Sequence, residues 1–173
     1  LLERHYGVSG PEWTTDAVYR RLSHVERGTS RMEADELTYQ AHIVVRYELE
    51  RRLLSGDLPV RDLPGAWTEL MDRRLGLCPL NDVEGCLQDV HWPLGSFGYF
   101  PSYAVGAIIA SQLWESMRED LGDLDDDLRR GEFSRLTGWL GGNVHALGAK
   151  MSVPDLVRHA TGRPLSVAPH LRY

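Results

Sequence analysis

Apolar residues that recur every three to four positions, in segments that end at a glycine, most restrict how this chain can fold. The longest such segment is "SRMEADELTYQAHIVVRYELERRLLSGD", residues 30–57, with Gly56 as a natural helix stop. Its apolar positions are Met32, Leu37, Ala41, Val44, Val45 and Leu49. Similar signals predict helices over 14–28, 65–76, 101–122, 133–148 and 152–162. Because no segment alternates convincingly between apolar and polar residues, the sequence predicts an all-α fold.

Length and charge limit the class of protein. A chain of 173 residues suits a single helical domain or a part of a larger one. The net charge of −6, without a basic stripe, argues against a nucleic-acid partner. The longest apolar run, "AVGAIIA" at 104–110, is too short to cross a membrane. Cys78 and Cys86 are too few for a disulfide framework, and we expect two small buried thiols in a reducing cytoplasm.

The connector "GCLQDVHWPLGSFGYFPSY", residues 85–103, has the composition of a site rather than of a plain loop. It sets His91 beside Trp92, with Asp89 two positions earlier, among glycines and prolines. One interpretation is structural, with a histidine in a loop and aromatic rings in the core. The other is a pocket in which Asp89 orients the imidazole and the rings exclude water.

The start of the long helical segment carries a second candidate. Arg31 and Asp35 are four residues apart, so on a helix they share a face, which Tyr39, His42 and Arg46 continue. One interpretation is a ladder of exposed or half-buried ion pairs. The other is an arginine held by Asp35 so that its planar fork faces a cleft and binds a ligand carboxylate through two parallel hydrogen bonds.

The histidines do not have the spacing of a hydrolytic zinc site. None of the seven is followed by Glu, and no two are separated by three residues. The HExxH motif and its reverse, which place two ligands one helical turn apart, are therefore absent from this sequence. We predict no metal ligand in this chain.

Several ordered motifs resemble one family. "GCLQDVHW" matches the GxxQDxHW motif of the M32 metallocarboxypeptidases, the carboxypeptidase Taq family, at every specified position. "SRMEADELTYQAHIVVRYELE" resembles the IRxxAD region of that family, with Ser30 where the family has Ile. "GDLPVRDLPGAW", "GSFGYFPSYAVG" and "HATGRPL" resemble other parts of its C-terminal half, so the resemblance runs from about residue 16 to the end.

The resemblance implies a helical fold whose long helices line one wall of a cleft, and an activity that releases single residues from peptide C-termini. It implies zinc or cobalt in a complete family member, held by HExxH and by a Glu in a later HES segment. Both motifs belong upstream of the matched region. We therefore expect this chain to be the C-terminal half, inactive alone, without the metal-binding half. The family further implies a cytoplasmic homodimer, with the N-terminal half as another partner.

The resemblance also assigns roles to individual residues. Arg31 would bind the terminal carboxylate of the peptide, and His91 would stabilise the oxyanion that develops at the scissile carbonyl. Tyr103 would help bind the substrate or the tetrahedral intermediate, with Tyr99 as the weaker substrate-binding candidate. The supporting residues would be Asp35, Gln88, Asp89 and Trp92. Arg31, His91 and Tyr103 should then converge on one cleft wall, with Asp35 or another carboxylate close enough to orient the Arg31 guanidinium.

Two other functions stay open from the sequence. The chain is alternatively a non-catalytic regulatory module that binds peptides or dimerises, or a structural helical domain whose cleft residues are vestigial. The preferred side chain at the peptide terminus is not readable from these residues.

Overall fold

The computed structural model describes residues 2–173, and this part of the chain is helical, without strands. The predicted all-α fold is confirmed. The chain forms two compact units, residues 1–101 and residues 102–173. That the two units together make up a single helical domain stays a prediction. Within residues 2–173, no helix is both long and apolar enough to span a membrane.

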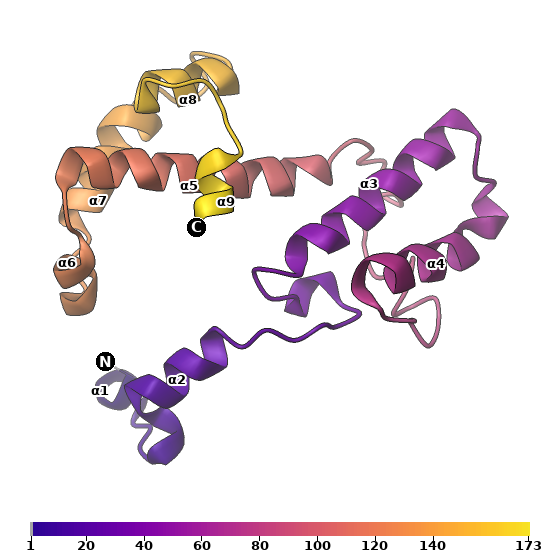
Figure 1. Cartoon of the computed structure of the whole chain (residues 1–173), viewed down its shortest axis with the longest axis horizontal. Coiled ribbons are helices and arrows are strands. Elements are labelled where there is room, and N and C mark those ends of the chain that lie inside the picture. The colour runs from indigo at the N-terminus through magenta and orange to yellow at the C-terminus, as the bar shows by residue number, and fades with distance from the viewer. Residues whose placement is uncertain (1) are drawn as a thin grey trace. The chain divides into compact units, whose positions relative to one another are not determined.

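The helices follow one another along the chain as Figure 1 labels them. The first unit contains α1 (Leu2–Tyr6), η1 (Pro11–Trp13), α2 (Thr15–Leu22), η2 (Arg31–Glu33), α3 (Tyr39–Ser55), η3 (Val60–Asp62) and α4 (Leu63–Leu75). The helix α5 (Pro101–Leu121) leads into the second unit, which continues with α6 (Asp125–Arg130), α7 (Ser134–Leu140), η4 (Gly141–His145), α8 (Val153–Thr161) and α9 (Ala168–Arg172).

Three predicted helices agree with the structure to within two residues at each end. The segments 65–76, 101–122 and 152–162 form α4, α5 and α8. The segment 14–28 forms only the shorter α2, and 133–148 forms α7 followed by a π-helical turn that begins at two glycines, where helix propensity is lowest. The short helices α1 and α9 were not predicted, because so few residues carry little periodic signal. The acidic run at 122–128 predicts a solvated helix start, and α6 begins within it at Asp125.

The largest departure lies at the start of the segment 30–57, where the long helix α3 begins only at Tyr39. The Asp35 carboxylate accepts hydrogen bonds from the Leu37 and Thr38 backbone N–H groups, both at 2.9 Å. Such local bonds compete with a helix that runs through the residue. The prediction that Arg31 and Asp35 share a helix face is therefore wrong. Met32 and Leu37, which the periodicity included, are exposed by 79% and 74%.

The core of the first unit lies between α3 and α4, which run side by side (Figure 1). Val45 and Leu49 of α3 pack with Trp67, Leu70 and Met71 of α4, and all of them are buried. Burying each of these large apolar side chains contributes about 1.5–3 kcal/mol. Gly56 ends α3 with a left-handed φ of 82°, a conformation that a residue with a Cβ adopts only at a cost.

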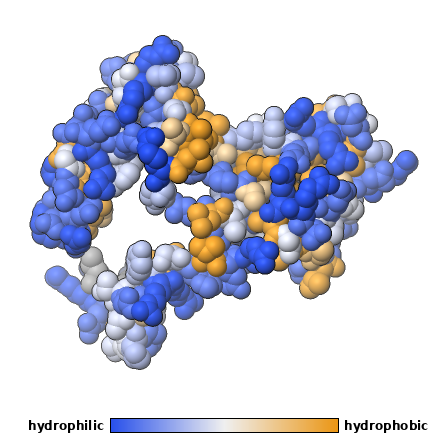
Figure 2. Space-filling model, in the orientation of Figure 1, coloured by the Kyte–Doolittle hydropathy of each residue, from blue (hydrophilic) through white to orange (hydrophobic). Residues whose placement is uncertain are grey.

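The connector between α4 and α5 contributes Cys86 to this core, with Leu77 and Trp92 packed against it, while other apolar residues of the connector lie at the surface. Cys86 is buried in the cluster, but Cys78 is exposed, so the prediction of two buried thiols is wrong for Cys78. Further along the connector, Val83, Leu87 and Leu94 are exposed by 71%, 65% and 75%. Apolar residues thus form part of the molecular surface, and Figure 2 colours hydrophobic residues orange.

One face of α3 carries polar side chains into the interior. His42, Arg46 and Glu50 are spaced four residues apart, so they follow one another along the same side of the helix. All three are buried, with His42 and Arg46 completely inaccessible to solvent. Since charged groups are almost never fully buried without partners, this face requires a polar network around it.

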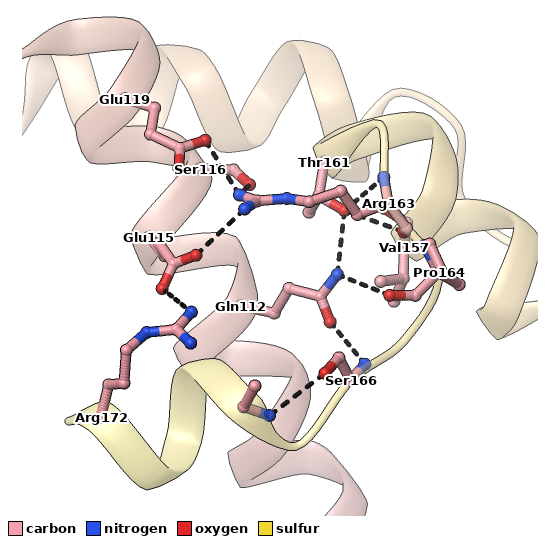
Figure 3. Close-up of polar contacts among 11 residues, drawn as sticks. Gln112, Glu115, Ser116, Glu119, Val157, Thr161, Arg163, Pro164, Ser166 and Arg172 are labelled. Atoms are coloured by element: carbon pink, nitrogen blue, oxygen red, sulfur yellow. Dashed lines mark hydrogen bonds and ion pairs between the residues drawn. The ribbon is translucent and has the colours of Figure 1, made fainter.

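The second unit has its own core and its own polar network. Met117, Leu124, Trp139 and Ala160 are buried together. The side-chain amide of the buried Gln112 in α5 donates to the Pro164 carbonyl at 3.0 Å and accepts from the Ser166 backbone N–H at 2.9 Å. As Figure 3 shows, these bonds tie the segment that follows α8 to α5.

The buried His42 predicts how the free energy of unfolding depends on pH. Burial, followed by the positive charge of Arg46, lowers the pKa of His42 from 6.5 to about 4. The unfolded chain therefore binds a proton between these values that the folded chain does not, and the folded state loses stability as the pH falls from 6.5 to 4. This shift corresponds to roughly 3 kcal/mol.

Chemical denaturation across this pH range measures the effect. We expect His42→Gln to flatten the slope of stability against pH, and the matched change His24→Gln, at a histidine whose side chain is 66% exposed, to leave it unchanged. Equal slopes for the wild type and His42→Gln would contradict the prediction.

Candidate functional site

The site is organised around Asp89, whose carboxylate lies between two arginines. Asp89 Oδ1 accepts from Arg31 Nη2 at 2.7 Å and from Arg31 Nε at 3.1 Å. Asp89 Oδ2 accepts from Arg46 Nε at 2.5 Å. The exposed fractions of the three side chains are 7% for Asp89, 9% for Arg31 and 0% for Arg46. Charge-assisted bonds among groups so well shielded from water fix the direction of each guanidinium.

Gln88, the neighbour of Asp89, joins the same two arginines. Its Oε1 accepts from the Arg31 backbone N–H at 3.1 Å and from Arg46 Nη2 at 2.7 Å. Its Nε2 donates to the Glu84 carbonyl at 2.7 Å and to the Thr29 carbonyl at 3.1 Å. Gln88 thereby holds the backbone around Arg31 against the connector.

His91 lies against the same carboxylate and against aromatic rings. Its Nδ1 is 3.7 Å from Asp89 Oδ1. Its ring centroid is 4.4 Å from that of the buried Phe100 and 5.5 Å from that of Tyr99, which is 51% exposed. Because the two ring nitrogens lie on different sides of an imidazole, an Nδ1 turned toward Asp89 leaves Nε2 directed away from it.

Glu50 fastens the remainder of the loop to α3. One carboxylate oxygen accepts from Trp92 Nε1 at 2.7 Å and the other from the Gly98 backbone N–H at 2.5 Å. Gly98 has a φ of 74°, in the left-handed region that favours glycine. The Trp92 ring meets those of Trp67 and Phe100 edge to face. The loop that carries His91 is therefore held at both of its ends.

The charges of the cluster support one another. Burial by itself raises the pKa of Asp89, but the positive charge of Arg46 and the hydrogen bonds from both arginines lower it below its ordinary value. Burial acts to lower the pKa of Arg31, whereas its hydrogen bonds to Asp89 and Tyr39 raise it overall. Burial lowers the pKa of Arg46, although a guanidinium in a protein stays protonated. Asp89 is thus an anion between two cations.

The predicted site residues divide into those that meet in the first unit and one in the second. Arg31 and His91, which we expected near one another, both lie at Asp89. Gln88 and Asp89 bond to Arg31, whereas Trp92 bonds to Glu50, and the supporting roles of these residues stay a prediction. Tyr103 stands in the second unit, in the first turn of α5, so its convergence with Arg31 and His91 stays a prediction.

Asp35 does not have the predicted role. Its carboxylate accepts from backbone groups of Glu26, Leu37 and Thr38 and shapes the turn before α3, while Asp89 holds the Arg31 guanidinium. The surface-ladder interpretation is also wrong, because His42 and Arg46 are completely buried.

Sequence reasoning did not assign a site role to Tyr39, Arg46 or Glu50. Tyr39 accepts from Arg31 Nη1 at 3.3 Å through its hydroxyl oxygen. The spacing of His42, Arg46 and Glu50 along one helix face was visible in the sequence. No feature of the sequence indicated that this face of the helix is buried rather than solvated.

Metal-ligating residues do not gather in this structure. Within residues 2–173, no group of three or more His, Cys, Asp or Glu side chains could hold a metal ion. The residues present therefore do not fit a metal site, and we assign no chemical step to a metal held by them.

Comparison with known proteins connects this arrangement to one family. The family model of the carboxypeptidase Taq (M32) metallopeptidases matches residues 1–173. Carboxypeptidase 1 of Bacillus subtilis is 45% identical over 152 residues, which are 88% of this chain and 30% of that protein. Thermostable carboxypeptidase 1 of Thermus thermophilus is 42% identical over the same shares of the two chains. This chain thus spans about a third of the length of these relatives.

Solved structures agree with the sequence comparison. The structure of Trypanosoma cruzi metallocarboxypeptidase 1 superimposes with a TM-score of 0.93 at 38% identity, over 99% of this chain and 36% of that one. The M32 carboxypeptidase of Deinococcus radiodurans gives a TM-score of 0.88 at 40% identity, over 99% of this chain and 34% of that one. With its motifs, its helical fold and a family match along its whole length, the chain belongs to the carboxypeptidase Taq (M32) family of metallopeptidases.

Proposed function

We propose that these residues form the part of a metal-dependent carboxypeptidase that binds the free C-terminus of a peptide, whose last residue the complete protein releases. The observation that carries this proposal is the guanidinium of Arg31, which is buried and held by Asp89 beside His91. An exopeptidase must recognise one free carboxylate, and a fixed arginine fork is suited to that task.

The geometry of Arg31 supports this role. Asp89 occupies the edge of the guanidinium formed by Nε and Nη2, and the Tyr39 hydroxyl lies at Nη1. A guanidinium whose plane is fixed offers parallel N–H groups that match the two oxygens of a ligand carboxylate. Because Asp89 already fixes the plane of the fork, little rotational freedom would be lost on binding.

His91 and the two tyrosines complete the proposed substrate contacts. With Nδ1 turned toward Asp89, a protonated Nε2 of His91 would donate to the oxygen on which negative charge develops at the scissile carbonyl. Tyr103 would contact the substrate or the tetrahedral intermediate, and Tyr99 would line the approach. The long helices would form one wall of the cleft.

The remaining features of the complete protein are also proposed. Zinc or cobalt, held by residues outside this sequence, would supply the Lewis acid and the activated water. The protein would be cytoplasmic and homodimeric, with an N-terminal half packed against these residues. No nucleic acid or membrane would take part.

A second function is favoured by one observation. Asp89 holds the Arg31 guanidinium, the proposed carboxylate-binding group, while no metal-binding set is present within residues 2–173. A chain with this combination would bind peptide C-termini, or dimerise, without cutting them. In a purely structural domain with vestigial cleft residues, by contrast, Arg31 would contribute nothing to binding.

The first prediction concerns the free carboxylate. A peptide with a free C-terminus should bind about tenfold or more tightly than its C-terminal amide, because the amide removes a charge-assisted pair. Arg31→Met should abolish this difference, and Arg31→Lys should restore only a part of it because lysine has no fork. Calorimetric titration with both peptides, under a chelator, measures the difference.

The control for this experiment is Arg61→Met, which removes an arginine whose side chain is 85% exposed in the same unit. It should leave the preference unchanged. If Arg31→Met retained the full preference for the free carboxylate, the assignment of Arg31 would be wrong.

The second prediction is that a polypeptide of these 173 residues alone does not hydrolyse peptides. HExxH is absent from its sequence, and a catalytic metal needs about three protein ligands. After incubation with zinc or cobalt and a peptide with a free C-terminus, mass spectrometry should detect no release of the last residue. Metal-dependent release that survives repurification would refute this prediction.

The third prediction concerns association. Leu80, Val83, Leu87, Val90 and Leu94 of one connector are each exposed by 64% or more. Exposed apolar patches of more than a few hundred Å² mark interaction sites on soluble proteins. We expect a dimer or larger species at micromolar concentration, involving the long helices, as measured by sedimentation velocity. A single monomeric species across that range would count against it.

A further inference from the structure

We propose that Arg46 is a positioning residue that keeps the Arg31 guanidinium oriented toward a ligand carboxylate and gives the cluster around Asp89 a net positive charge. This inference rests on the proposed function, because it names a residue that makes the same binding site effective. Arg46 does not itself reach a ligand, since its side chain is fully buried.

The surroundings of Arg46 leave it a single orientation. Its guanidinium carbon lies 4.8 Å from the centre of the Trp67 ring and 5.8 Å from that of Phe100. Nη1 donates to the His42 carbonyl of its own helix at 2.8 Å. Cation–π contacts and a backbone bond at the same group hold the guanidinium in the interior, where it serves as a fixed partner for other groups.

The partners of Arg46 are the partners of Arg31. The two carboxylate oxygens of Asp89 are divided between the two arginines, and Gln88 Oε1 accepts from Arg46 Nη2 and from the Arg31 backbone N–H. Arg46 therefore fixes the two residues that fix Arg31. Since Arg46 lies on α3 and Arg31 lies before it, this is a link through side chains rather than along the helix.

The second effect of Arg46 is on the net charge of the group that it forms with Arg31 and Asp89. Arg31 and Asp89 alone would form a neutral pair, which attracts an anion weakly. With Arg46 added, two cations share one anion, and the group carries one net positive charge. Glu50, one turn further along α3, directs its carboxylate to Trp92 and Gly98 instead. Arg31 is the more accessible arginine, so it presents this excess charge to a ligand.

A neutral and a charged substitution of Arg46 distinguish a positioning role from a role in folding stability alone. Arg46→Met removes the charge and keeps most of the volume, whereas Arg46→Lys keeps the charge and loses the fork. The measured quantity is the ratio of affinities for a free-carboxylate peptide and for its amide, in the complete gene product that contains these residues and under a chelator. A merely structural residue would change both affinities alike and leave their ratio unchanged.

We expect Arg46→Met to lower this ratio about tenfold, the size of one charge-assisted interaction, and Arg46→Lys to recover a part of it. Arg73→Met, at an arginine whose side chain is 58% exposed on α4, is the matched control and should leave the ratio unchanged. Circular dichroism establishes that each variant is folded. An unchanged ratio in a folded Arg46→Met variant would overturn the inference while leaving the proposed function intact.

The two remaining outcomes are also decisive. If the wild type binds both peptides equally, the proposed function fails, and the Arg31 Nε–H resonance in nitrogen-15 NMR decides the positioning role. An Arg31 Nε–H signal with the same shift and exchange protection in folded Arg46→Met would then overturn it, and loss of both would support it. If both Arg46→Met and Arg46→Lys unfold, Arg46 serves stability alone and the inference is overturned.

Discussion

A single carboxylate, Asp89, connects the parts of the first unit that local structure leaves separate. Its two oxygens accept from arginines that stand 58 and 43 residues away in the sequence. Each of these charges would be costly to bury alone, and removing one partner of such a group typically costs about 3–5 kcal/mol. The turn that holds Arg31, the helix α3 and the connector before α5 are therefore mutually dependent through this one side chain.

The helix α3 supplies the platform for this arrangement because it has two different buried sides. Val45 and Leu49 face the apolar core with α4, while His42, Arg46 and Glu50 form a polar row. Arg46 bonds to Gln88 and Asp89 of the connector that follows α4, and Glu50 bonds to Trp92 and Gly98 further along that connector. A helix spaces these groups by one turn each, so their relative positions are rigid even though their partners lie in loops.

Recognition and bond cleavage are divided between different residues in this proposal. The described residues place a fixed guanidinium and an imidazole at one carboxylate, an arrangement suited to binding and orienting a peptide terminus. They do not gather a metal-binding set within residues 2–173. This division explains why binding of a free carboxylate, rather than hydrolysis, is the property by which a polypeptide of these residues is best tested.

The sequence by itself determined the helical class, the extents of α4, α5 and α8, and the motif that contains Gln88, Asp89 and His91, because periodicity, caps and short motifs are local properties. It misjudged the partner of Arg31, since spacing in the sequence favoured Asp35. Only the tertiary structure decided that Asp35 shapes a turn, that Asp89 pairs with Arg31 across 58 residues of sequence, and that Arg46 is buried at the other oxygen of Asp89. The physical reason is that burial and long-range ion pairing depend on how α3, α4 and the connector pack, which no local window of sequence records.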